Sequence, residues 1–250
     1  MIFRKANVPT STTGDLDGRD RGRRGRRIKD DVPTWPEEES AGELTDVPSA
    51  DGARARSSKD HGPYDASEVD SVHDPLAAGR VDLGGLQVRA IEGIELRLQV
   101  DEASQAVVAA LFVRGDAALE LRAFAAPRSS GLWDEIRREI AVETTRRGGV
   151  VTETTGPFGT ELKVVVPTRT PDGQQVTQAS RIVGVDGPRW FLRGTLIGRA
   201  AADPEAAGPL LAAMSEIVVI RGKAPMAPRD MIPLQIPEAA RMVAPGAGQQ

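Results

Sequence analysis

The stretch that decides the predicted fold is RWFLRGTLI, residues 189–197. It has large side chains at both odd and even positions. Successive side chains of a β-strand point to opposite faces, so Trp190 and Leu192 are expected on one face and Phe191 and Arg193 on the other. A strand with large side chains on both faces is typical of the middle of a sheet that is covered on both sides. The segment therefore predicts a central β-strand.

Apolar runs before and after this strand extend the predicted sheet. The runs with strand-like spacing, separated by Gly and Asp turn signals, are residues 86–91, 94–100, 106–113, 118–125, 150–155, 161–166, 176–185 and 217–220. We expect 86–91 and 94–100 to be joined at Glu92-Gly93, and 106–113 and 118–125 to form a hairpin. In the last of these, Glu120, Arg122 and Phe124 alternate with smaller apolar residues. That alternation favours an antiparallel sheet with one face in water.

Two helices are predicted to pack on the sheet. The first begins at Ser129-Ser130, where a serine would cap the free amides, and stops at Gly148-Gly149. It places Trp133, Ile136 and Ile140 on one apolar stripe, which is typical of a buried face. The second begins at Asp203-Pro204, although Pro209 moves its expected start towards Gly208. The fold class expected is α+β, an antiparallel sheet with two packed helices.

Composition separates a charged arm from this domain. Residues 1–75 hold 12 Lys or Arg and 16 Asp or Glu, which accounts for the whole net charge of −4. Such a segment buries too little apolar surface to offset its chain entropy, so it is expected to be disordered. The predicted parts are a disordered arm at 1–75, an α+β domain at 76–222, a proline-rich strap at 223–241 and a frayed tail at 242–250. The strap is expected to lie over its own domain. The alternative is that it binds as an extended peptide in a groove of a partner protein.

The residues of the predicted domain exclude several classes of enzyme. From Leu76 onwards the sequence has no Cys, His or Tyr, which are the usual metal ligands, nucleophiles and bases near neutral pH. The run Gly156-Pro157-Phe158-Gly159 lacks the spacing of a phosphate-binding loop. We therefore expect no enzyme, no cofactor and no catalytic or metal-binding residues.

Two groups of arginines are the candidate binding residues. The first group is interpreted as part of a charged linker that pairs with itself, and a nucleic-acid-binding arm is the alternative. Its members are Arg19, Arg21, Arg23, Arg24, Arg26, Arg27 and Lys29. The second is Arg189 and Arg193, which alternation places on one strand face as contacts for an anion or ligand. For this pair we favour salt bridges across the sheet to Glu153 or Glu161, and binding of an anion or ligand is the alternative.

Four motifs resemble one family. They are Gly131-Leu132-Trp133, the run 156–159, the run GPRWFLRG at 187–194, and the proline-rich segment from Ala227 to Leu234. Together, over about Val81 to Pro237, they resemble the actinobacterial domain-of-unknown-function family 3710. The resemblance implies a cytoplasmic protein, and it implies no particular activity. The order of elements is also similar to the fold shared by the Ran-binding nuclear-transport protein and the extrinsic P subunit of photosystem II, whose members are mostly binding or accessory modules.

The sequence therefore predicts a cytoplasmic, non-catalytic interaction or accessory module with an unknown protein partner. One alternative is a nucleic-acid-associated protein that uses residues 19–29. Another is a small enzyme or anion-binding protein that uses Arg189, Arg193 and a carboxylate. No run of about 20 apolar residues is present, so no membrane span is expected.

Overall fold

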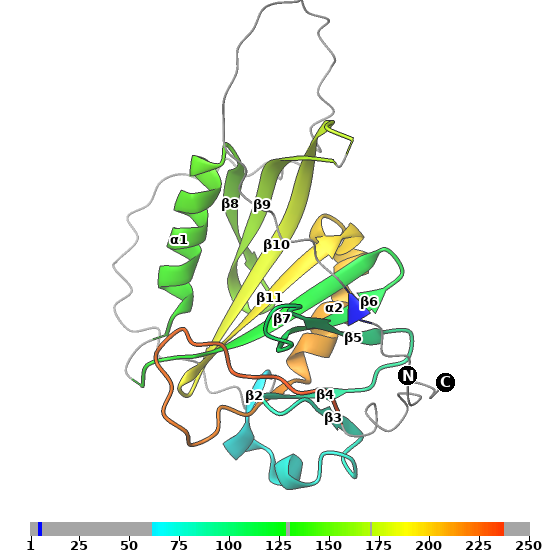
Figure 1. Cartoon of the computed structure of the whole chain (residues 1–250), viewed down its shortest axis with the longest axis vertical. Coiled ribbons are helices and arrows are strands. Elements are labelled where there is room, and N and C mark those ends of the chain that lie inside the picture. The colour runs from blue at the N-terminus through cyan, green and yellow to red at the C-terminus, as the bar shows by residue number, and fades with distance from the viewer. Residues whose placement is uncertain (1–4, 7–61, 129–130, 171, 238–250) are drawn as a thin grey trace, which may run out of the picture.

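Two β-sheets and two α-helices make up the described part of the chain. The structure is a computed structural model and describes residues 5–6, 62–128, 131–170 and 172–237 (Figure 1). Within these residues the large sheet has the strand order β1-β5-β6-β7-β11-β10-β9-β8 and the small sheet the order β2-β12-β4-β3. The α+β class and the mainly antiparallel pairing are confirmed, whereas a single sheet was predicted and two are found.

The bounds of the elements follow the chain. The large sheet contains β1 (Lys5–Ala6), β5 (Glu95–Val100), β6 (Val107–Arg114), β7 (Ala117–Ala125), β8 (Val150–Gly156), β9 (Gly159–Arg169), β10 (Gln175–Gly187) and β11 (Trp190–Gly198). The small sheet contains β2 (Tyr64–Asp65), β3 (Arg80–Asp82), β4 (Leu86–Arg89) and β12 (Val218–Val219). The helices are α1 (Trp133–Arg146), α2 (Pro204–Ser215) and three 3-10 turns, η1 (Ala66–Glu68), η2 (Asp70–His73) and η3 (Arg199–Ala201).

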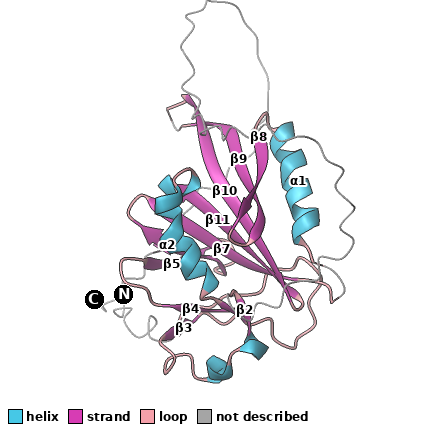
Figure 2. Cartoon of the chain, turned by 180° about the vertical axis from the view of Figure 1, so that it is seen from behind, coloured by secondary structure: helices cyan, strands magenta, loops and turns pink. Residues whose placement is uncertain are grey.

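The two α-helices lie on opposite faces of the large sheet, as Figures 1 and 2 show from the front and from behind. Gly184 of β10 leaves room for the ring of Trp133 at the start of α1. Gly194 of β11 leaves room for Met214 of α2. Gly184 is paired with Arg193, so the Arg193 side chain lies on the face that α1 covers and not on the face where Met214 packs against Gly194. We call the face that carries Arg193 the α1 side.

The main core lies on the other side of the large sheet. It joins the inner side chains of β5–β7 and β11 to α2 and the small sheet; its members include Leu86, Leu96, Leu119, Trp190, Leu210 and Val219. A second cluster lies under α1 and includes Trp133, Leu162 and Phe191. Central strand β11 contributes to both clusters, so the prediction from residues 189–197 is confirmed.

The predicted pairing of 86–91 with 94–100 is wrong. Strand β4 pairs with β3 and β12 in the small sheet, whereas β5 pairs with β6 and, in parallel, with β1 in the large sheet. Gly93 between them has a positive φ of 76°, which suits a turn that redirects the chain. The hairpin of β6 and β7 is confirmed, with Arg114 opposite Ala117.

The predicted arm is too long at its C-terminal end, because residues 62–75 belong to the folded part. The Tyr64 amide donates to the Ile217 carbonyl over 2.8 Å, and the indole Nε1 of Trp190 donates to Asp65 Oδ2 over 2.8 Å. This short segment also contains η1 and η2. Tyr64 and His73 are therefore part of the described domain, contrary to the expectation that it holds no Tyr or His.

The cap of α1 differs from the prediction, whereas α2 begins at Asp203-Pro204 as predicted and not at the later start near Gly208. The predicted cap Ser129-Ser130 lies outside the described residues, and the Asp186 carboxylate accepts from the amides of Leu132 and Trp133 instead, over 2.7 Å and 3.2 Å. Helix α2 begins at Pro204 after the Asp203 cap and continues through Pro209. A proline there removes one backbone hydrogen bond, and the burial of Leu210 and its neighbours outweighs that loss.

The strap lies over its own domain as far as Pro237, the last described residue. Its Ile232 and Leu234 side chains are buried in the main core. Its amides and carbonyls bond to the sheets: Ile232 N donates to Ala123 O, and Gln235 N donates to Leu83 O. The prolines interrupt regular pairing, so the strap forms isolated bridges to Gly84, Val107 and Phe124 in place of a strand.

Candidate functional site on the open half of the large sheet

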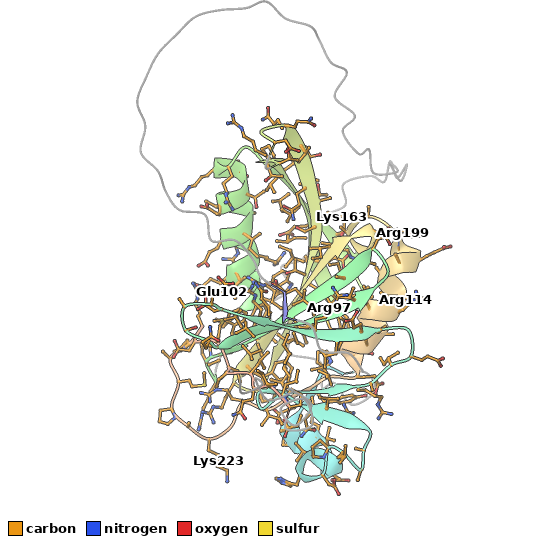
Figure 3. The ribbon with its side chains drawn as sticks, turned by 45° about the vertical axis from the view of Figure 1, so that its right-hand side comes forward. Arg97, Glu102, Arg114, Lys163, Arg199 and Lys223 are labelled. Carbon is orange, nitrogen blue, oxygen red and sulfur yellow. The ribbon has the colours of Figure 1, made fainter. Side chains whose placement is uncertain are left out.

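One half of the α1 side has no helix over it. Helix α1 packs on β8, β9 and β10, and among the described residues no helix covers β5, β6 and β7 on that side (Figure 1). On this side β6 presents apolar residues, whereas β5, β7 and β11 carry charged and amide side chains. We call this set the polar half-face: Glu95, Arg97, Gln99, Glu120, Arg122 and Arg193. Figure 3 labels Arg97 on β5 and Lys163 on β9, two strands that lie near opposite ends of the strand order.

The strand register places two arginines side by side. Arg122 of β7 is directly opposite Arg193 of β11, and Arg193 is opposite Gly184 of β10. On the other side of β7 from Arg193, Gln99 of β5 is opposite Ala109 of β6. Directly opposed side chains of antiparallel strands lie about 5 Å apart at Cβ, so the two positive charges repel unless something neutralises them.

Only one of these two arginines has an acidic partner. The Arg122 Nε donates to Glu120 Oε1 over 2.8 Å, and its Nη2 lies 3.5 Å from Gln99 Oε1. Among the described residues no carboxylate or carbonyl accepts a hydrogen bond from Arg193, and its Nε is buried without a partner. Its guanidinium carbon instead lies 5.6 Å from the centre of the Phe124 ring. Arg193 therefore has no ion pair and no hydrogen-bond acceptor among the described residues.

Burial makes this charge costly. Loss of solvent lowers the pKa of the Arg193 guanidinium, the neighbouring Arg122 charge lowers it further, and Glu120 opposes both effects. A guanidinium remains protonated in proteins even so. The contact with an aromatic face compensates a cation only in part, and a buried charge without a partner destabilises the protein. An anion bound here would supply the missing partner.

A stack of aromatic rings holds the site. The rings of Phe124 and Phe191 are stacked at 6.0 Å, and those of Phe191 and Trp133 at 5.9 Å. The Trp133 indole Nε1 also donates to the Thr160 carbonyl over 2.7 Å, which fixes the end of α1 against β9. Three packed rings leave Arg193 little freedom, so less entropy is lost when it binds.

Comparison with known protein families finds one family model that matches this domain. The profile of the protein of unknown function DUF3710 matches residues 62–242, which is most of the chain. The chain belongs to the DUF3710 family. The match begins at the residue where the described domain begins. No curated protein matches the chain.

Arg189 does not join Arg193 in the DUF3710 domain, contrary to the prediction. It lies in the turn before β11 with a positive φ of 63°, where its carbonyl accepts from the Ala126 amide over 2.8 Å. Alternation was extended one residue too far, because β11 begins at Trp190. The opposite placement of Trp190 and Arg193 is confirmed.

The predicted salt bridges to Glu153 and Glu161 are wrong for these arginines. Glu153 pairs with Arg137 of α1 over 2.7 Å, and Glu161 pairs with Arg181 of β10 over 2.6 Å. The two acids lie on β8 and β9, three and two strands from the β11 strand that carries Arg193. The local pattern could not show this, because it does not reveal the strand order.

The remaining candidates lie elsewhere. The basic residues 19–29 are outside the described residues of the DUF3710 protein. Within the described ranges, no three Asp, Glu, His or Cys side chains are grouped to hold a metal ion. No helix there has the length and hydropathy needed to cross a membrane.

Arg122 and Phe124 are the site residues that sequence reasoning did not select. Their alternation with Leu121 and Ala123 did predict a polar face. The missing information was that β7 and β11 are neighbours, which brings Arg122 opposite Arg193.

Proposed function

We propose that the DUF3710 domain is a cytoplasmic, non-catalytic interaction module that recognises an anionic group through Arg193 and Arg122. The observation that carries the proposal is the Arg193 guanidinium, which lies over Phe124 and has no hydrogen-bond acceptor among the described residues. Arginine presents a planar fork of donors that matches a carboxylate or a phosphate. An anion between the two guanidiniums would also remove their mutual repulsion.

A binding role suits the side chains around Arg193 better than catalysis does. Glu120 accepts two hydrogen bonds from Arg122 and is not a free base. Thr195 is opposite Glu120, with no other base on this face beside it. Hydroxyl nucleophiles need an adjacent base. The resemblance to the fold of the Ran-binding nuclear-transport protein, whose relatives are mostly binding modules, supports the same proposal by analogy.

The proposal is tested by titrating the full chain with inorganic phosphate at constant ionic strength, with chloride as the replaced anion. The readouts are the amide NMR signals of Gly184 and Gly194, which flank Arg193 across and along the strands. They report this site even when phosphate also binds elsewhere. We expect saturable shifts in the wild type and at least a tenfold weaker affinity in Arg193→Met.

Arg199→Met is the matched control, because Arg199 is exposed on η3 and pairs with Asp203. It should bind phosphate as the wild type does. Arg193→Lys should retain part of the phosphate affinity, since an ammonium group keeps the positive charge but lacks the planar set of donors of a guanidinium. Equal phosphate affinity in the wild type and Arg193→Met would overturn the proposal.

A further inference from the structure

The ladder between β6 and β7 opens into a fork before either strand ends. Their pairing runs from Arg114 opposite Ala117 to Ala110 opposite Leu121 and stops there, although β6 begins at Val107 and β7 continues to Ala125. The strap enters this gap. Met231 pairs with Phe124 on β7, and Leu234 pairs with Val107 on β6.

The strap does not fill the fork completely. It leaves a cavity of about 180 Å³ whose walls include Val107, Val108, Ala123, Met231, Pro233 and Leu234. These side chains are all apolar. An apolar cavity of about 150 Å³ is large enough to hold a benzene molecule. The fork can therefore accept an apolar group about the size of a phenyl ring.

Phe124 connects this cavity to Arg193. Its ring lies under the Arg193 guanidinium, and its backbone pairs with Met231, which lines the cavity. Paired residues of antiparallel strands share a face, so Met231 lies on the α1 side next to Phe124. Met231 is 45% exposed although it is apolar, so this edge of the cavity is open to solvent.

We infer that the fork is a second subsite, for the apolar part of a ligand whose anionic group binds Arg193. This inference rests on the proposed function. The strap and β11 lie on either side of β7, two strand spacings or about 10 Å apart. A ligand that reaches from the cavity to the guanidinium thus needs a flexible spacer of methylenes between its ring and its charge. The ligand class is a small organic anion with a terminal apolar group.

The test is isothermal titration calorimetry of the full chain with acetate, benzoate, 3-phenylpropionate, 4-phenylbutyrate and the neutral 3-phenylpropanol. We expect 3-phenylpropionate or 4-phenylbutyrate to bind at least tenfold more tightly than acetate, and more tightly than benzoate and the alcohol. Burial of the ring should also make the heat capacity change of binding negative.

Ala106→Phe is the variant that tests the cavity itself. Ala106 lies at its rim and is exposed, so a larger side chain there blocks the entrance without disturbing the core. Ala103→Phe is the matched control, since Ala103 is exposed in the same turn and does not line the cavity. Ala106→Phe should weaken 3-phenylpropionate at least fivefold and leave acetate and phosphate unchanged.

The two proposals fail in different ways. If phosphate binds at Arg193 and the phenylalkanoates gain nothing over acetate, the second subsite is wrong and the anion site stands. If 3-phenylpropanol binds as well as 3-phenylpropionate, or Arg193→Met leaves 3-phenylpropionate unaffected, the joining of the two subsites is wrong. If neither phosphate nor the phenylalkanoates shift the signals beside Arg193, both proposals fall.

Discussion

Two neighbouring strands of the large sheet, β10 and β11, each hold a partly buried arginine, and the two arginines differ in their partners. On β10, Arg181 is paired with Glu161 over 2.6 Å, and their side chains are 12% and 3% exposed. On β11, Arg193 is also buried in part and lies over an aromatic ring with no carboxylate among the described residues. One arginine is an internal structural partner, and the other has unused hydrogen-bonding capacity. The difference teaches that charge and burial alone do not mark a binding site, whereas the partner of the charge does.

Removing Glu161 should give the largest effect. Glu161→Leu leaves the buried Arg181 without its partner, and breaking one side of a buried ion pair costs about 3–5 kcal/mol. We expect the free energy of unfolding in urea to fall by that amount. The double variant Glu161→Leu with Arg181→Met is the control and should recover most of the loss, because no buried charge remains. If Glu161→Leu alone is as stable as the wild type, the ion pair of Arg181 and Glu161 does not stabilise the fold, and the contrast with Arg193 is wrong.

Crowding α1 should give the next largest effect. A Cβ added at Gly184 would lie 2.3 Å from Cδ2 of Trp133, so Gly184→Ala forces the helix away from the sheet. Overpacking of this kind costs about 1–3 kcal/mol of unfolding free energy. Gly208→Ala is the control, since nothing lies within 4 Å of a Cβ there and alanine favours the interior of α2. It should leave stability unchanged or raise it. If both variants behave alike, the close contact of Trp133 with β10 is wrong.

Much of this fold follows from the sequence, and the missing part has a physical cause. Alternation in residues 118–125 and bulk in residues 189–197 predict β7 and β11, because burial acts on each strand separately. The split into two sheets was missed, since a turn at Gly93 is compatible with either a hairpin or a change of sheet. The site was half predicted for the same reason. Arg193 was selected from its own strand, whereas Arg122 depends on which distant strand becomes its neighbour.

The cap of α1 should make stability depend on pH. Burial raises the pKa of the Asp186 carboxyl above 3.8, although the Leu132 and Trp133 amides partly oppose the shift. A raised pKa in the folded state means that folding favours the protonated form, so this group adds stability at low pH and loses it as pH rises through its folded pKa. The unfolding free energy of the wild type relative to Asp186→Asn should therefore increase as pH falls from 7 towards 4. A constant or decreasing difference would contradict the shift.

Replacing Arg193 should have the smallest effect on the free energy of unfolding. This variant therefore tests directly how Arg193 differs from Arg181. Arg193→Met removes a desolvated charge without leaving an acid unpaired, and we expect the unfolding free energy to change by less than about 1 kcal/mol or to rise. Arg181→Met, which orphans Glu161, should lose several times more. Thermal and urea unfolding of the two variants side by side provide the measurement. Equal losses would mean that both arginines are structural.

The strap in the fork of β6 and β7 also sets a time order for folding. The gap in the ladder is closed by residues 231–234, which leave the ribosome long after the hairpin that they complete. Strand β2 likewise waits for β12, since Tyr64 pairs with Val218. Contacts between residues so distant in sequence slow folding and leave apolar surface exposed meanwhile. During synthesis, the edge of β7 that pairs with the strap is thus made before its partner, residues 231–234.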